Sequence, residues 1–508
     1  MDDVVLPRPT TRASPRIVAT LARPSVRAAL ILSLAAAVFV GVPWKDQSLS
    51  SDTVVYAQIG AEIVERGDPT RLTFDGQPAS KKPPLVFWLL AATYTAFGKS
   101  DATASLPSQV AGLATVWLLM FLVARHHGRR AAFWAGLSCA TWAVFARTAR
   151  TCRLDTTLAF FTLASIGAFL AIDRRQATPL RSLGLGGLLG LAVLAKGPPG
   201  FIPVAAIVLG GLFAGRGRLL RQVAPWALLG LFALTVPWYA LQILREGSTW
   251  WSQLRDDWAR TSAPIQGVLP AIRFYLNDVF VPGLPWVLPL VFGVALAVRR
   301  IRRGRRAALE ESLLLAWILC FLAVLPAIRM HYSRYFAQVV PAFAWLGAVW
   351  LAPAIRRFAR VPIPWLSRVR GVHKAAAVVI AAGILVGYPV YLIRATGTRE
   401  NRYEDMGAAV RILQEVEPGA RTLPAWTFAH EEGAAEALPW PMVAAGRFYF
   451  GTRLVPFREG DLDQPPVLYF QHTKLGPTAT AEFEATHPYA VLRRTARATV
   501  YRTREPTR

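Results

Sequence analysis

The sequence predicts a polytopic α-helical membrane protein with a small α/β domain at its C-terminal end. Hydrophobic residues make up 54% of the 508-residue chain, and its mean hydropathy is +0.34. Several apolar runs exceed the roughly 18 residues that mark a membrane span. The surplus arginines lie in short loops between these runs, and the composition becomes polar from about residue 397. These features together predict a membrane-embedded helical body followed by a water-facing domain.

The apolar runs predict about eleven spans. These are 26–43, 103–124, 131–148, 156–172, 182–198, 200–214, 222–243, 280–298, 311–328, 335–353 and 374–394. The sequence KGPPGF joins the fifth and sixth runs, and the sixth is short, so the number ranges up to thirteen. The stretch 85–98 is too short to cross a bilayer and predicts a juxtamembrane or re-entrant helix.

The formal net charge of +26 has an ordered distribution. Arginine clusters follow alternate spans, which is the positive-inside pattern that orients helices in a membrane. We therefore expect a cytoplasmic basic arm at 1–27, a retained first span, and a transmembrane domain over 28–395. Polar stretches 44–84, 244–278 and 395–508 then fall on the opposite side. Because the loop arginines are explained by orientation, they do not indicate nucleic-acid binding.

Residues 396–508 predict a small α/β domain on the outer side. Tyr403, Met406 and Val410 recur at helical spacing, and apolar strand-like segments follow. A lid or acceptor-docking module and a purely structural cap both fit this composition. The cysteines at 139, 152 and 320 all lie in or beside apolar segments. Their positions indicate neither a disulfide framework nor zinc-ligand spacing.

Charged residues recur beside the apolar runs on the expected outer side. An ionised group near hydrocarbon costs roughly 2.5–3.5 kcal/mol on insertion scales, so such groups usually pair or meet a charged ligand. Snorkelling of lysine and arginine to lipid headgroups is the alternative for single cations. The residues of this outer set are Asp52, Lys81, Lys82, Arg150, Arg153, Asp155, Lys196, Arg329, His331, Arg334 and Tyr335.

The two acids of this set are harder to explain by snorkelling. Asp52 precedes a predicted short helix, and Asp155 begins a long apolar one, so each is also a candidate N-terminal cap. Two carboxylates facing one cavity among several cations favour a functional pair over two unrelated caps. We expect Asp52 and Asp155 to converge at the outer side.

A carboxylate among cations suits glycosyl transfer from a lipid-linked sugar phosphate. Cations stabilise the departing phosphate and so replace a general acid. A carboxylate deprotonates or orients the acceptor hydroxyl, and a second one supports positive charge on the sugar ring. If the acceptor is itself a phosphate, no base is required and Asp52 serves in orientation.

The stretch 51–98 resembles the first outer loop of the bacterial aminoarabinose transferase (ArnT) and protein O-mannosyltransferase group, which has the GT-C fold. The shared order is an Asp, Tyr-Ala, Gly-Asp, Lys-Pro-Pro, Phe-Gly and Leu-Pro-Ser. This chain supplies them as Asp52, Tyr56-Ala57, Gly67-Asp68, Lys82-Pro83-Pro84, Phe97-Gly98 and Leu106-Pro107-Ser108. RLDTTLAFF, LAKGPPGF and SRYFAQVVPAFA resemble further motifs of the same group. The topological resemblance covers about residues 1–395.

The resemblance implies an inverting glycosyltransferase of the bacterial inner membrane, with its C-terminal domain in the periplasm. The donor would be a polyprenyl-phosphate sugar, hexosyl or pentosyl, and the acceptor a lipid A-like lipid, a glycan or a protein. Asp52 and Asp155 would be catalytic. Substrate-binding residues would be Tyr56, Lys81, Lys82, Arg150, Arg153, Lys196, Arg334 and Tyr335.

The chain departs from the aminoarabinose transferases at one position, where Lys81 replaces a frequent Glu. The loop 244–278 also has no histidine. We therefore expect no metal ligands at these two places, although a divalent-cation requirement stays open. Two other classes remain alternatives: a transporter or flippase of lipid-linked sugars, which needs the same cations, and a non-catalytic membrane scaffold.

Overall fold

The computed structural model describes most of the helical body. The described residues are 52–79, 82–248, 250–252, 255, 268–304, 308–325 and 332–358, position 33, and the backbone of five short strands beyond residue 420. The predicted arm at 1–27, most of the first span and the run at 374–394 lie outside them. So do Lys81, Arg329 and His331.

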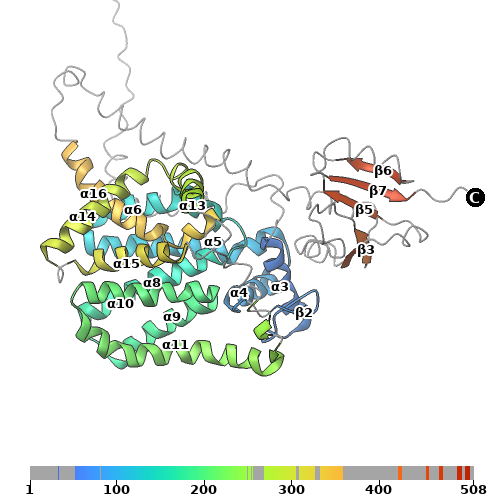
Figure 1. Ribbon diagram of the computed structural model, residues 1–508, viewed down its shortest axis with the longest axis horizontal. Helices are drawn as coiled ribbons and strands as arrows, with labels where there is room; N and C mark the ends of the chain where they lie inside the picture. Colours follow the sequence, from blue (N-terminus) through green and yellow to red (C-terminus); the bar gives the residue numbers. More distant parts are fainter. Residues whose placement is uncertain are drawn as a thin grey trace, which may run out of the picture.

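Four helices are long and apolar enough to cross a membrane within the described part of the chain. They are α5 (Asp101–His127), α8 (Asp155–Arg175), α9 (Pro179–Lys196) and α11 (Gly217–Glu246). Shorter helices complete the bundle: α6 (Arg129–Thr141), α10 (Ile202–Phe213), α14 (Val287–Arg303), α15 (Leu309–Val324) and α16 (Val340–Phe358). Figure 1 shows them packed side by side. The predicted helical membrane body is confirmed, whereas the exact number of spans stays a prediction.

Three predicted spans are irregular rather than continuous helices. The run 131–148 is divided into α6 and α7 (Ala143–Ala149) by extended backbone at Trp142. The run from 280 becomes helical only at 287, after α13 (Val268–Tyr275) and the π-helix η2 (Leu276–Phe280). A 3₁₀ turn, η5 (Ser333–Gln338), precedes α16. Apolar composition is uniform across such breaks, so hydropathy alone does not locate them.

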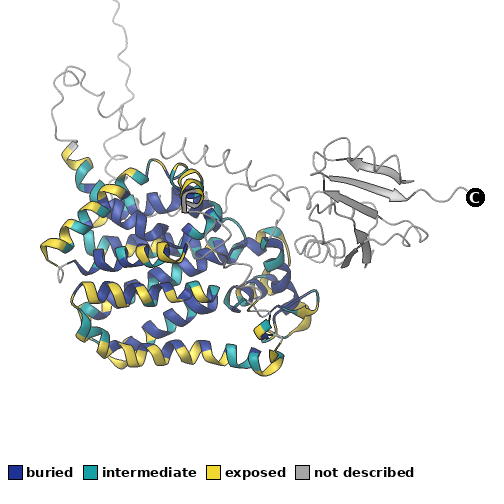
Figure 2. Ribbon diagram, in the orientation of Figure 1, coloured by how far each residue is buried: buried dark blue, intermediate teal, exposed yellow. Residues whose placement is uncertain are grey.

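Aromatic side chains fill the centre of the bundle. Trp142 is fully buried and packs against Phe343 of α16 with ring centroids 5.5 Å apart. The rings of Phe336 and Phe321 also pack together, with their centroids 4.9 Å apart. In Figure 2 the buried residues gather inside the bundle, while α11 is extensively exposed along its length. Its exposed side chains include Leu229 and Phe232, as expected for a surface that faces lipid.

Helices α9 and α11 pack with their backbones in contact. A Cβ atom added at Gly186 of α9 would lie 2.1 Å from the carbonyl oxygen of Ala227. One added at Gly230 of α11 would lie 2.5 Å from the carbonyl oxygen of Leu183. Small residues permit this approach in membrane helix pairs. The two glycines therefore fix the position of α11, a helix of 30 residues.

The first loop folds as α3 (Asp52–Arg66), a hairpin of β1 (Thr73–Phe74) and β2 (Gln77–Pro78), and then α4 (Leu85–Phe97). Asp75 and Gly76 form the hairpin turn with φ angles of 51° and 77°, the left-handed conformation that tight hairpins require. The predicted helices in this loop are confirmed. Whether α4 is re-entrant stays a prediction.

Two small sheets lie in the predicted C-terminal domain. Strands β3 (Thr422–Ala425) and β4 (Arg453–Pro456) pair in parallel. The strand order β5-β7-β6 is antiparallel, with β5 at Leu468–His472, β6 at Tyr489–Arg494 and β7 at Ala498–Thr503. The predicted helices of this region lie outside the described residues, so the α/β domain stays a prediction.

The arginine-rich ends of the long helices lie opposite the predicted site residues. Asp155 begins α8, and Arg174 and Arg175 end it. Arg181 lies in the first turn of α9, and Lys196 ends that helix. A helix of 21 residues is about 32 Å long, so the two ends of α8 are separated by roughly the thickness of a bilayer core. The helical body thus has a site end and an arginine-rich end.

Candidate active site

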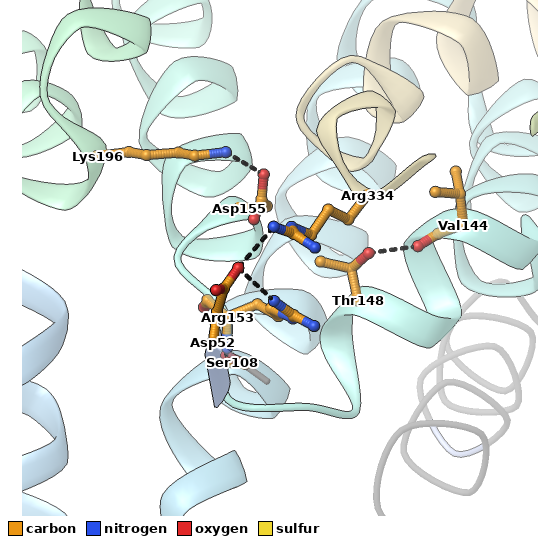
Figure 3. A network of polar contacts seen from close by, with 8 residues as sticks. All are labelled: Asp52, Ser108, Val144, Thr148, Arg153, Asp155, Lys196 and Arg334. Carbon is orange, nitrogen blue, oxygen red and sulfur yellow. Dashed lines mark hydrogen bonds and ion pairs between the residues drawn. The ribbon is translucent and has the colours of Figure 1, made fainter. Parts of the chain in front are cut away.

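Asp52 is held by two arginines from distant parts of the chain. Its Oδ2 atom accepts a hydrogen bond from Nη2 of Arg334 at 2.7 Å and a longer one from Nη1 of Arg153 at 3.5 Å. Figure 3 shows both guanidinium groups directed at the carboxylate. The Asp52 side chain is 41% exposed, whereas those of Arg334 and Arg153 are 14% and 9% exposed. The carboxylate is thus open to a ligand while its partners are buried.

Asp155 forms the second ion pair of the site. Its Oδ1 atom accepts a hydrogen bond from Nζ of Lys196 at the end of α9. Asp155 is the first residue of α8, Leu154 is the N-cap, and no side-chain capping bond is made there. The alternative of Asp155 as an N-cap is therefore wrong, although an acid in the first turn still favours the helix dipole. The predicted convergence of Asp52, Asp155, Arg153, Lys196 and Arg334 is observed (Figure 3).

Two tyrosine rings support the cations. The guanidinium of Arg334 lies 3.7 Å from the ring centroid of Tyr332, and Lys196 Nζ lies 4.7 Å from that of Tyr335. Such contacts stabilise a cation without neutralising it. Burial raises the pKa of Tyr56, and the nearby Asp52 raises it further. Its phenol therefore remains protonated and able to donate a hydrogen bond.

Local contacts set the position of Arg153. The Oγ atom of Ser108 accepts from the backbone N–H of Arg153 at 2.9 Å and donates to its carbonyl oxygen at 2.7 Å. Ser108 belongs to the Leu-Pro-Ser motif in α5. The motif therefore has a structural role: it fixes the backbone from which Arg153 reaches Asp52.

The turn at Gly197 brings the segments that carry Lys196 and Lys82 close together. Gly197 follows Lys196 with a φ of 71°, and its N–H donates to the carbonyl oxygen of Val193. A Cβ added at Gly197 would lie 3.8 Å from Pro83, the residue after Lys82. The Lys-Pro-Pro and Lys-Gly-Pro motifs thus meet in space. Lys81 lies outside the described residues.

The segment before Lys82 is attached to α3 by the buried Glu62. Its carboxylate accepts hydrogen bonds from Thr73 Oγ1 at 2.6 Å and from the backbone N–H groups of Asp75 at 2.7 Å and Gly76 at 3.3 Å. Gln58 donates to it at 3.2 Å. Glu62 therefore holds the hairpin against the helix that begins with Asp52. Nothing in the sequence pattern had distinguished it from a surface acid.

The remaining predicted cation, Arg150, is the C-cap residue of α7. Burial lowers the pKa of its guanidinium to about 10, so the group stays charged at neutral pH. Arg147, three residues earlier, was not predicted. It lines a hollow with Arg153 and Arg334. The run ARTARTCR has arginine at every third position, 147, 150 and 153, and this spacing was the available signal.

The charges of the site do not balance. The three ion-paired cations Arg153, Lys196 and Arg334 share two carboxylates, which leaves one positive charge even before Lys82 is counted. Keeping ionised groups away from water costs several kcal/mol per ion unless each is well paired. The arrangement therefore favours an anionic ligand beside an accessible carboxylate. Within the described residues, no group of three or more His, Cys, Asp or Glu side chains is arranged to hold a metal ion.

The fold and the motifs have counterparts among known proteins. Residues 81–240 match the sequence family described as dolichyl-phosphate-mannose-protein mannosyltransferase. The chain thus resembles the ArnT and protein mannosyltransferase group over this region. Among solved structures, ArnT from Cupriavidus metallidurans bound to undecaprenyl phosphate superposes with a TM-score of 0.68 at 19% identity, over 97% of this chain and 99% of that one.

A more distant structure shares the same architecture. The archaeal oligosaccharyltransferase AglB from Archaeoglobus fulgidus, in complex with an inhibitory peptide and a dolichol-phosphate, has a TM-score of 0.55 at 13% identity. It is matched over 85% of this chain and 64% of that one. The helical body thus has the GT-C fold seen in ArnT and AglB.

Relatives in sequence are undecaprenyl phosphate-alpha-4-amino-4-deoxy-L-arabinose arabinosyl transferases. The protein from Aeromonas salmonicida (strain A449) is 28% identical over 319 residues, which cover 60% of this chain and 56% of that protein. One from Pseudomonas aeruginosa (strain UCBPP-PA14) is 25% identical over 485 residues, covering 83% of this chain and 85% of its own length. The match to the first of these spans little more than half of that relative.

Proposed function

We propose that the protein is a lipid-carrier-dependent glycosyltransferase. It would transfer a sugar from a polyprenyl-phosphate donor to a lipid, glycan or protein acceptor. The observation that carries the proposal is the accessible Asp52 carboxylate held by two buried arginines, beside the Asp155–Lys196 pair. Similarity to arabinosyl transferases and to a family of mannosyltransferases supports the same class. It leaves pentosyl and hexosyl donors both open.

The transfer needs one bond to form and one to break. The acceptor hydroxyl oxygen bonds to the anomeric carbon of the sugar, while the bond from that carbon to the phosphate oxygen breaks with its electron pair leaving on the phosphate. Asp52 takes the hydroxyl proton and later releases it to water. Attack opposite the departing phosphate inverts the anomeric centre. The products are the glycosylated acceptor and polyprenyl phosphate.

The cations act on the departing phosphate. Lys196 and Lys82 lie on the two motifs that meet at Pro83 and Gly197, and we assign them to the carrier phosphate. Preorganised cations stabilise developing charge without reorganising during the reaction. Asp155 holds Lys196 in place and adds a negative charge near the sugar ring. Tyr56 donates a hydrogen bond to a substrate oxygen.

We further propose that the protein lies in the inner membrane of a bacterium, with the site end at the periplasmic face. The opposite end carries exposed arginines on helix after helix, which the positive-inside rule places in the cytoplasm. Under this orientation the N-terminal arm is cytoplasmic and the C-terminal domain periplasmic. A cysteine at an exposed position of each end, labelled from outside intact cells, tests the assignment.

Replacing Asp52 with Asn tests the proposed function. Transfer from an undecaprenyl-phosphate sugar and binding of undecaprenyl phosphate are measured separately on the purified full-length protein. We expect the transfer rate to fall about 10²–10⁴-fold, as for loss of a general base, with carrier binding retained. Transfer at the wild-type rate would remove the catalytic assignment. Carrier binding with no transfer by the wild-type protein would favour a transporter of lipid-linked sugars.

A further inference from the structure

The C-terminal end of α11 contacts both segments that carry the lysines assigned to the carrier phosphate. Trp238 packs edge to face against Trp88 of α4, with ring centroids 5.6 Å apart, and α4 begins directly after Lys82 and its two prolines. The hydroxyl of Tyr239 lies 4.0 Å from the position that a Cβ atom would take at Gly197, the residue after the second lysine. Figure 1 shows this end of α11 beside α4 and the hairpin. The end of α11 is thus a common support for the two lysine motifs.

The same end of α11 also holds the turn between α3 and the hairpin. Gln242 Nε2 donates to the carbonyl oxygen of Thr70 at 3.1 Å. Arg245 Nη1 donates to that oxygen at 3.2 Å and to Thr70 Oγ1 at 2.7 Å. Trp88 of α4 donates from Nε1 to the carbonyl oxygen of Pro69 at 2.7 Å. Two successive carbonyl groups of the turn therefore accept hydrogen bonds from helices that follow it in the chain.

Asp68 connects the turn internally. Its Oδ1 atom accepts hydrogen bonds from the backbone N–H of Thr70 at 2.9 Å and from Thr70 Oγ1 at 2.6 Å. The threonine hydroxyl gives its proton to Asp68 and accepts from Arg245, so the three side chains form one continuous chain of hydrogen bonds. A displacement of the end of α11 is therefore passed to the turn as a whole.

The buried amide of Gln242 is not explained by packing alone. The side chain is fully buried, and its Oε1 atom has no hydrogen-bond partner among the residues that the structure describes. A buried polar atom without a partner costs free energy, so an apolar side chain of similar size would pack at this position at lower cost. What the amide adds is the bond from Nε2 to Thr70. This bond indicates a role in holding the first loop.

We propose that Gln242 and Arg245 are positioning residues for the carrier phosphate. They hold the turn at Thr70 and, through the hairpin and α4, fix the place of Lys82 relative to Lys196. The inference rests on the proposed function, because it assumes that these two lysines bind the carrier phosphate. The two α11 residues act on that phosphate through the first loop and do not contact it themselves.

Carrier binding, measured apart from transfer, tests this role. The full-length protein in nanodiscs is titrated with undecaprenyl phosphate, and its unfolding temperature is measured without ligand. We expect Gln242→Leu/Arg245→Gln to weaken binding about tenfold, as for loss of hydrogen bonds from a charged group. The unfolding temperature should stay unchanged, because leucine removes an unpartnered buried oxygen and Arg245 is exposed. Arg221→Gln, which removes an exposed arginine near the start of the same helix, is the matched control and should leave binding unchanged.

A double-mutant cycle with Lys82 tests whether the α11 residues act through the first loop. Lys82→Gln alone should weaken undecaprenyl phosphate binding by a similar factor. Adding the two α11 substitutions to it should cause little further loss, because positions that act through one contact are not additive. In the Gln242→Leu background, Arg245→Lys should bind more tightly than Arg245→Gln, since a lysine keeps a charged donor for Thr70.

Three results would overturn the positioning role. They are unchanged undecaprenyl phosphate binding in Gln242→Leu/Arg245→Gln, an equal loss in Arg221→Gln, or full additivity with Lys82→Gln. If the double variant unfolds at a lower temperature, Gln242→Leu alone provides the measurement, because Arg245 still donates to Thr70. Absence of carrier binding by the wild-type protein, or of any effect of Lys82→Gln, would instead contradict the proposed function, so the two failures are distinguishable.

Discussion

The two ends of the helical body carry ion pairs of different kinds. At the arginine-rich end, Arg216 binds Asp173 through two bonds of 2.6 Å and 3.0 Å, and Arg300 binds Glu311 at 2.6 Å. These pairs connect the end of one helix to the start of another. The other arginines that the structure describes at this end are exposed, and water or headgroups solvate them.

At the site end, the surplus positive charge is buried. Arg153 is 8% exposed and takes part in a cluster with more cations than carboxylates. The other members of this cluster come from α3, the start of α8, the end of α9 and η5. The comparison teaches that the two sets of basic residues differ in their surroundings: one set is exposed or joins helix ends, and the other lies in a buried cluster that we propose binds an anionic ligand. The following substitutions test that difference.

The largest effect on stability is expected from breaking the buried pair at the site end. Asp155→Asn leaves Lys196 buried without its counter-ion, and loss of one partner from a buried pair costs about 3–5 kcal/mol. The double variant Asp155→Asn/Lys196→Met should recover most of this free energy but not the transfer activity. Denaturant unfolding in detergent measures the free energy of unfolding of the two variants, and a transfer assay measures their activity. A single variant as stable as the wild type would show that water reaches Lys196.

The next largest effect is expected on the rate of sugar transfer when Arg334 is replaced. Arg334→Gln removes a buried donor from the site and should lower the transfer rate about 10²–10³-fold, the size found when one preorganised donor is lost. Arg300→Gln is the control, because Arg300 forms an ion pair of similar length, 2.6 Å, at the opposite end. Equal losses in the two variants would mean that the ends are not functionally distinct.

Glu62→Gln should have a moderate effect. The substitution removes the charge that three donors of the hairpin and Gln58 share, and weakening hydrogen bonds to a charged group costs about 1.5–3 kcal/mol. Since the hairpin precedes Lys82, we expect KM for the donor to rise about tenfold with little change in kcat. Glu65→Gln, on the exposed side of the same helix, should leave both unchanged. A loss in kcat alone would assign Glu62 a different role.

The smallest effect concerns the pH dependence of stability at the arginine-rich end. Burial raises the pKa of Glu310, but the 2.5 Å hydrogen bond with His126, a backbone hydrogen bond and the charges of His126 and His127 together lower it below its usual value. A depressed carboxyl pKa stabilises the fold above the unfolded value and loses that contribution as the pH falls through the folded one. Unfolding temperatures between pH 6 and pH 3 should therefore fall less steeply in Glu310→Gln than in the wild type. Identical slopes would contradict the assignment.

Sequence reasoning located most of the site residues but few of their partners. Asp52, Arg153, Asp155, Lys196 and Arg334 were identifiable because charged residues beside apolar runs are costly and therefore conspicuous. Arg334 and Asp52 lie far apart in the chain, so their 2.7 Å contact depends on packing that no local period encodes. Glu62 was missed for the same reason, because its burial follows from the tertiary fold and not from its neighbours in sequence.

Because α11 is long and contacts the first loop near its C-terminal end, the position of that loop depends on how the helix lies in the membrane. At 30 residues the helix is about 45 Å long, and a bilayer core is about 30 Å thick. Near its C-terminal end, Gln242 and Arg245 donate to the carbonyl oxygen of Thr70 at 3.1 Å and 3.2 Å. In a thicker or thinner bilayer the tilt of such a helix changes, and the loop that it holds would be raised or lowered with it. The acyl-chain length of the bilayer lipids would thereby set the depth in the membrane at which the first loop can contact the phosphate of the proposed carrier.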